Sequence, residues 1–187
     1  MRIIGGILLI LAVVIRDGTS ILYTVFNHIR DRSLDTYIST PATYIRLTVA
    51  ILCLLTAVLI AAGKHTAAGV LQMAALSLQT FFFFCYTVGI RYGTVRINGT
   101  TLVGAALLTA MLLYALGLLI RGKAGMVLLI AAGAAMVSYL LSSFINPFIF
   151  GGVVRSQIIL SAVILVTAGP LYFMGMLFTG IYQGSRK

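Results

Sequence analysis

The stretch that decides the fold is 45-IRLTVAILCLLTAVLIAA-62, which is followed, after Gly63-Lys64-His65, by 66-TAAGVLQMAALSLQTFFFFCYTVGI-90. Both segments are close to the roughly 20 apolar residues that a helix needs to cross a membrane. The short joint between them forces an antiparallel helical hairpin. Because neither segment offers a continuous polar face to water, this hairpin predicts an integral membrane protein.

The rest of the chain repeats the pattern on both sides of this hairpin. Arg121-Gly122-Lys123 joins two further apolar runs much as Gly63-Lys64 joins the first two, which predicts a second hairpin. We therefore predict an all-α bundle of about six transmembrane helices in a single domain, residues 1–187. The approximate spans are 3–27, 45–62, 66–90, 100–120, 124–146 and 158–182.

Composition supports this assignment. Of the 187 residues, 61% are hydrophobic and 9% are charged, and the only acidic residues are Asp17, Asp31 and Asp35. A net charge of +10 would suggest nucleic acid as the partner of a soluble protein. Here the basic residues lie at span ends, where they meet lipid headgroups. We expect membrane lipids as partners and no nucleic acid.

The first span differs from the others because it contains two charges. The run from Ile3 to Ile15 has the size of a signal-peptide core, but Arg16-Asp17 and a further apolar stretch follow it, so we expect one retained helix over 3–27. A charge within the membrane costs on the order of 3 kcal/mol, and one interpretation of such a pair is a ligand-contacting or coupling role. The alternative is that Arg16 snorkels to the headgroups. Adjacent helical residues point about 100° apart, so each charge is expected to have a separate partner.

Polar residues recur on two of the apolar spans. Gln72, Gln79 and Tyr86 are seven residues apart, and Ser138, Ser142 and Asn146 are four apart. Such rows keep to one helix face. They either line a water-filled path or form hydrogen bonds between helices. We expect the two helices to meet near the bundle centre, which makes these six residues candidate lining residues.

Two prolines predict local breaks. Pro147 is expected to end the fifth span at Asn146, because proline lacks a backbone donor. Gly169-Pro170 is expected to kink the sixth span near its middle.

Four arginines lie near the starts of spans on one face of the predicted bundle. They form a candidate site for an anion or a lipid headgroup, and the alternative is ordinary interfacial anchoring. They are Arg46, Arg91, Arg96 and Arg155.

The orientation of the bundle is not decided by its charges. Six spans place both termini on the same side, and we expect that side to be the cytoplasm of a cell with the bundle in its plasma membrane. Basic residues are equally numerous on the two faces. One face carries Arg2, Lys64, Arg121, Lys123, Arg186 and Lys187, and the other carries Arg30, Arg32, Arg46, Arg91, Arg96 and Arg155.

The residues that membrane enzymes use are scarce in this chain. His28 and His65 are the only histidines and fall on opposite faces, so we expect no metal, no cofactor and no catalysis. The favoured function is a small-molecule transporter or the solute-binding membrane subunit of a transport system. The first alternative is an assembly or sensory subunit that binds other membrane subunits or a second copy of itself. A membrane-embedded enzyme is the third.

Overall fold

The computed structural model describes residues 1–30, 40–89, 98–150 and 155–185, and within these ranges the regular structure is helical. Six helical stretches are long and apolar enough to cross a membrane, which confirms the predicted all-α membrane bundle. In chain order the elements are α1 (Arg2–Val13), η1 (Val14–Gly18), α2 (Thr19–Arg30), α4 (Pro41–Ala61), α5 (His65–Phe82), η2 (Phe83–Thr87), α6 (Gly99–Leu119), α7 (Gly122–Phe150) and α8 (Arg155–Gly184).

The spans agree with the apolar runs to within a few residues. The second span begins earlier than predicted because Thr40 is extended and Pro41, whose fixed φ suits a first helical turn, starts α4 there. The six spans are Arg2–Phe26, Pro41–Ala61, His65–Thr87, Gly99–Leu119, Gly122–Phe148 and Ile158–Gly184.

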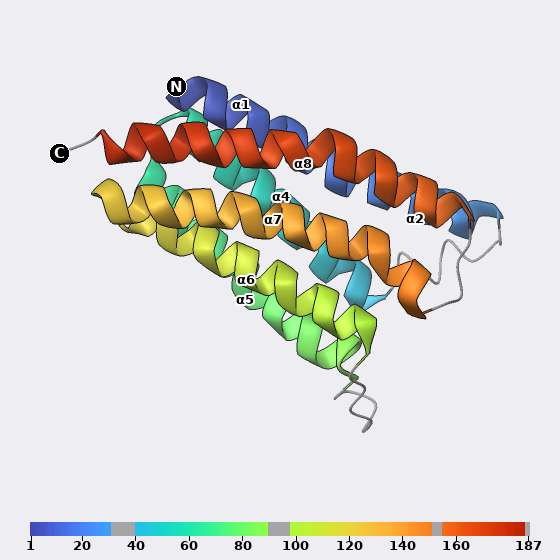
Figure 1. The fold of residues 1–187 in the computed structure, drawn as a ribbon. Helices are drawn as coiled ribbons and strands as arrows, with labels where there is room; N and C mark the ends of the chain where they lie inside the picture. The colour runs from blue at the N-terminus through green and yellow to red at the C-terminus, as the bar shows by residue number, and fades with distance from the viewer. Residues whose placement is uncertain (31–39, 90–97, 151–154, 186–187) are drawn as a thin grey trace.

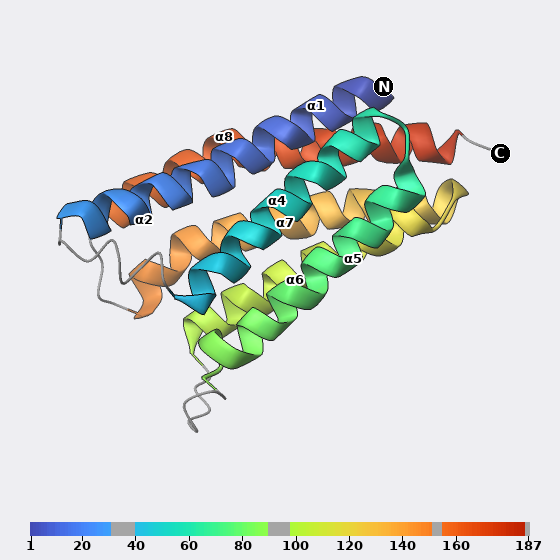
Figure 2. The ribbon, with the colours of Figure 1, turned by 180° about the vertical axis from the view of Figure 1, so that it is seen from behind.

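The helices pack in chain order around a closed ring. α1 packs against α4, α4 against α5, α5 against α6, α6 against α7, α7 against α8, and α8 returns to α1. Figures 1 and 2 show this arrangement from the two sides, with both termini at one end. We call this end the terminal end and the other the distal end. α6 lies between α5 and α7, so the third and fifth spans are not adjacent in the ring.

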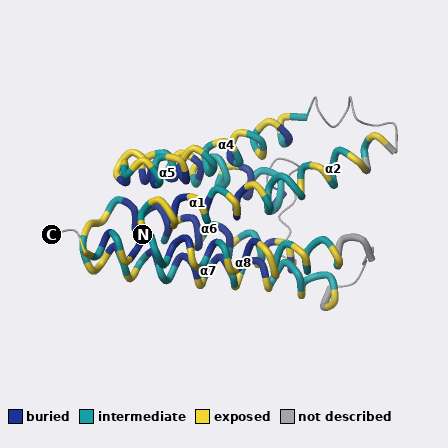
Figure 3. Tube along the Cα trace, turned by 90° about the horizontal axis from the view of Figure 1, so that it is seen from above, coloured by how far each residue is buried: buried dark blue, intermediate teal, exposed yellow. Residues whose placement is uncertain are grey.

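Small residues let the ring close. A Cβ atom on Gly6 would lie 2.6 Å from Cβ of Ala61 in α4, and one on Gly5 would lie 2.7 Å from Oγ1 of Thr179 in α8. The backbone of α1 therefore lies close to the backbones of α4 and α8, as glycine in membrane helices allows. Figure 3 shows the buried parts of the trace turned toward the interior of the bundle.

Glycine makes both hairpin turns possible, but in different ways. Gly63 follows α4 and has φ +81°. Its N–H donates to the carbonyl of Ile60 at 2.9 Å, and the N–H of Lys64 donates to the carbonyl of Leu59 at 2.8 Å. This is the Schellman arrangement that ends many helices. Gly122 has φ +77° and instead opens α7 after an extended Ile120.

The helices deviate from the predicted ones at three places. Pro147 does not end α7, which continues to Phe150. A proline so near the C-terminus removes a single helical donor, and the following residues complete the turn. η1 and η2 are π-helical turns within the first and third spans, each of which was predicted as one regular helix. α8 passes through Pro170 without ending, and the kink expected there stays a prediction.

Candidate functional site

A cavity with a volume of about 380 Å³ lies inside the ring. Residues from all six spans line it, which places it on the axis of the bundle. The lining begins at Arg16-Asp17, near the middle of the first span, and includes Thr43 near the distal start of α4. The cavity therefore occupies the distal half of the bundle, and we call it the axial cavity.

An ion pair between neighbouring residues lies at the inner limit of the axial cavity. Nε of Arg16 donates to Oδ1 of Asp17 at 2.7 Å, and Nη2 of Arg16 donates to Oδ2 at 2.9 Å. This geometry corrects the expectation that each charge has a separate partner. The arginine side chain is long enough to fold back along the π-helical turn and engage both carboxylate oxygens. The two side chains are 13% and 18% exposed, so the pair is largely shielded.

Arg16 also reaches across the ring. Its Nη1 lies 4.0 Å from the sulfur of Met136 in α7, and its guanidinium lies 5.7 Å from the ring centre of Tyr172 in α8. Contacts with two other helices direct this charge toward the axis. In this structure the arginine side chain points into the bundle.

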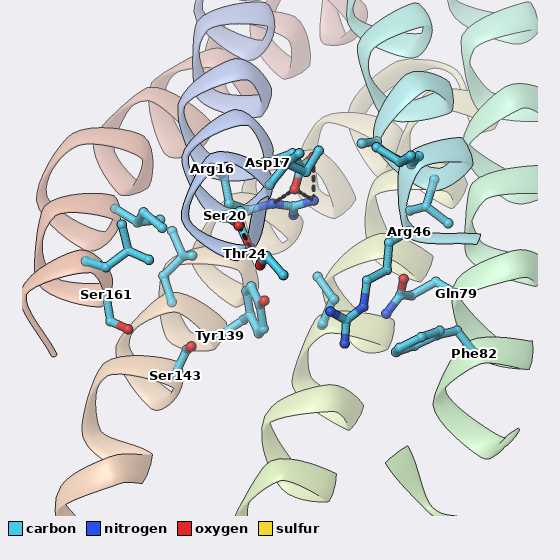
Figure 4. A pocket seen from close by; sticks show the side chains of 18 of the residues that line it. Arg16, Asp17, Ser20, Thr24, Arg46, Gln79, Phe82, Tyr139, Ser143 and Ser161 are labelled. Atoms are coloured by element: carbon cyan, nitrogen blue, oxygen red, sulfur yellow. Dashed lines mark hydrogen bonds and ion pairs between the residues drawn. The ribbon is translucent and has the colours of Figure 1, made fainter. Parts of the chain in front are cut away.

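One wall of the axial cavity carries a second positive charge. The guanidinium of Arg46 lies 4.8 Å above the ring of Phe82, with Gln79 beside them (Figure 4). Among the described residues the only ion pair joins Arg16 to Asp17, so Arg46 has no carboxylate partner there. The described lining therefore carries two arginines and one aspartate, a net charge of +1.

The facing walls are rich in hydroxyl groups. Tyr139 and Ser143 of α7 and Ser161 of α8 lie opposite Arg46, and Ser20 and Thr24 lie below the ion pair (Figure 4). Hydroxyl groups both donate and accept hydrogen bonds. The cavity thus offers a polar ligand several partners besides the charges.

A smaller cavity of about 10 Å³ lies on the terminal side of Arg16, which lines both cavities. Its other polar lining groups include Gln72, Tyr114 and Tyr172. Gln72 is 1% exposed, and its Oε1 has no hydrogen-bond partner. A space of this size holds about one water molecule.

The structure brings together only part of the site that the sequence predicts. Arg16, Asp17, Arg46 and Gln79 line the axial cavity, and Gln72 lines the smaller one. The sequence interpretation did not single out Tyr139, Ser143, Ser161 or Tyr172.

The remaining candidates lie elsewhere. Tyr86 stacks on Phe82 with the ring centres 5.2 Å apart, and exposed Ser138 donates to the carbonyl of Ala134 in its own helix. Ser142 and Asn146 line neither cavity, although Oδ1 of Asn146 is buried without a hydrogen-bond partner. Arg91, Arg96 and the side chain of Arg155 fall outside the described residues.

Within the described residues, no three histidine, cysteine or acidic side chains come close enough to hold a metal ion. No family model, no curated protein and no solved structure matches the chain.

Proposed function

We propose that this integral membrane protein is a non-catalytic transporter, or the solute-binding subunit of a transport system, and that it takes a small polar solute into the axial cavity. The observation that carries the proposal is a polar cavity lined by all six spans and bounded inside by an ion pair near the middle of the first span. A ring that is merely structural would be expected to fill its axis with apolar side chains.

The size and lining of the cavity favour a small solute. About 380 Å³ falls at the lower end of the range for small-molecule pockets, about 300 to 1,000 Å³. The lining includes several hydroxyl groups, Gln79 and three charged side chains. This mixture suits a ligand with several hydrogen-bonding groups.

The charge of the lining favours a solute with one negative charge. The described lining has a net charge of +1, because Asp17 offsets Arg16 and no acidic residue of the described part of the chain pairs with Arg46. A carboxylate or similar anion bound between the guanidinium groups would neutralise the site, and arginine pairs with such groups through two parallel hydrogen bonds.

The terminal half of the bundle is packed with buried apolar side chains. Leu9, Ile60, Leu118 and Met176 are each at most 1% exposed and come from four different helices. We call these four residues the apolar layer. A solute in the axial cavity would have to pass Arg16 and this layer to reach the terminal end, so we propose that solute enters and leaves this conformation from the distal side.

Thiol labelling tests whether the axial cavity holds water. Single cysteines at Gln79, Ser143 and Ser161 are made in a Cys53→Ser/Cys85→Ser background and exposed, in native membranes, to a small polar thiol reagent. We expect all three to react, because their side chains line the cavity. Ser77 and Ser138, which are exposed on the outer faces of α5 and α7, provide controls on the same helices. Buried in lipid, they should react slowly.

Protection of all three cavity positions in folded protein would contradict the transport proposal and favour the assembly alternative. One observation supports that alternative. α2 packs substantially only against η1 among the described elements, and its Leu22 and Phe26 are 67% and 75% exposed. A second membrane protein could cover this face, in which case cysteines at these two positions would crosslink to it in native membranes.

A further inference from the structure

A second large cavity lies at the opposite end of the bundle. Its volume is about 480 Å³, and it is formed by the α4–α5 turn, the α6–α7 turn and the end of α8. These three segments meet where the spans end, at the level of the lipid headgroups. We call it the terminal cavity, and its polar lining is Lys64, His65, Thr66, Arg121 and Gln183.

The charges of the terminal cavity have one sign. Lys64 and Arg121 are its charged lining residues, and the cavity has no acidic lining residue. Among the described residues the single ion pair is the one between Arg16 and Asp17, so neither Lys64 nor Arg121 is paired with a carboxylate. Two cations therefore face one space without a counter-charge from the described chain.

Backbone dipoles add to this positive potential. Lys64, His65, Thr66 and Ala67 form the first turn of α5, and Lys64 at its N-cap makes no capping hydrogen bond through its side chain. The first N–H groups of a helix have no intrahelical acceptor and carry the positive end of the dipole. This arrangement attracts phosphate and carboxylate groups at many helix starts.

The walls of the terminal cavity are fixed by contacts between its segments. Nε2 of Gln183 donates to the carbonyls of Leu118 at 3.2 Å and Ile120 at 2.9 Å, which ties the end of α8 to the turn that carries Arg121. The rings of His65 and Tyr182 lie 5.4 Å apart, which ties α8 to the start of α5. The two cations therefore project from segments that are held in place, which lowers the entropic cost of binding.

We propose that the terminal cavity binds a phosphate group, with Lys64, Arg121 and the first turn of α5 as its ligands. This site is distinct from the axial cavity and does not depend on the proposed transport function. The phosphate could belong to the headgroup of an acidic phospholipid or to a soluble phosphate. The headgroup is the nearer source because the cavity opens at the membrane surface.

The experiment measures binding to purified full-length protein in detergent. Retention of phosphatidylglycerol is quantified by native mass spectrometry against phosphatidylcholine, and inorganic phosphate is added separately with the thermal unfolding temperature as readout. Arg121→Gln and Lys64→Gln should each weaken binding about fivefold, since a cation near a membrane surface contributes about 1 kcal/mol. Lys123→Gln is the matched control, because exposed Lys123 lies two residues from Arg121 but does not line the cavity.

Each outcome bears on the proposal. Preferential retention of phosphatidylglycerol that depends on Lys64 and Arg121 supports a lipid headgroup, and stabilisation by inorganic phosphate with the same dependence supports a soluble phosphate. If Lys123→Gln weakens binding as much as Arg121→Gln, or if neither the retention of phosphatidylglycerol nor the stabilisation by inorganic phosphate depends on Lys64 and Arg121, the proposal is overturned. Each variant is first shown to unfold at the temperature of the unaltered protein when no ligand is present.

Discussion

At the scale of single residues, the ion pair of Arg16 and Asp17 supplies two of the three charges that line the axial cavity. It is also the place where removing one charge should cost the most unfolding free energy. Asp17→Asn would leave a shielded guanidinium without its counter-charge. We expect this variant to lose about 3 kcal/mol of unfolding free energy, as when one partner of a buried pair is removed. Unfolding in mixed micelles of increasing SDS content provides the measurement.

The double variant Arg16→Met/Asp17→Leu is the control for this prediction. Because it removes both charges, its stability should return to within about 1 kcal/mol of that of the unaltered protein. A single variant that is as stable as the double variant would show that water or another group already solvates Arg16, and that the pair does not hold the first helix in place.

At the scale of elements, apolar runs predict which segments are helices but not how polar residues face. The spans were predictable because a membrane leaves a helix few other conformations. Ser138 shows why the face that a polar residue occupies could not be predicted. Its hydroxyl bonds to the carbonyl of Ala134 in its own helix, so a serine can face lipid as readily as a cavity. The π-helical turn at Arg16 could not be predicted either, because no residue pattern in this apolar run indicates it.

The facing of α7 gives a second prediction. Ser143 lines the axial cavity and Ser142 does not. In a protein whose only cysteine replaces Gln79, Ser143→Leu should slow labelling by roughly tenfold, because the larger side chain fills space between the two walls. Ser142→Leu should leave the labelling rate within about twofold. Equal effects of the two variants would contradict this prediction, because they would mean that α7 is rotated about its own axis relative to this structure.

Close packing of α1 gives a third prediction. Gly6→Val would put a branched side chain against the backbone of Ala61, so we expect a loss of about 2 to 3 kcal/mol of unfolding free energy from overpacking. Gly18→Ala is the matched control in the same span, since a Cβ there meets nothing within 4 Å. Alanine favours helix over glycine by about 1 kcal/mol, so this control should be neutral or stabilising. Similar losses in both variants would contradict the ring contact between α1 and α4.

At the scale of the whole molecule, the ring has an axis with two unequal halves. The distal half contains the axial cavity, whereas the terminal half contains the apolar layer of Leu9, Ile60, Leu118 and Met176. The ring order was not predictable from hairpin lengths alone. A short joint fixes which two helices are antiparallel, but it does not specify that α8 returns to α1 and closes the ring.

This asymmetry predicts access from one side only. A cysteine at Gln79 should react with a membrane-impermeant thiol reagent added from the distal side and not with the same reagent added from the side of the termini. A cysteine at Met176, which is 0% exposed and belongs to the apolar layer, should be protected from both sides. Affinity tags on the two termini identify the terminal side independently, because both termini lie at that end of the bundle (Figure 1). Reaction of Gln79→Cys from the terminal side in folded protein would show that the apolar layer does not close the axis. The axial cavity would then belong to a continuous pore rather than to a site that opens to one side at a time.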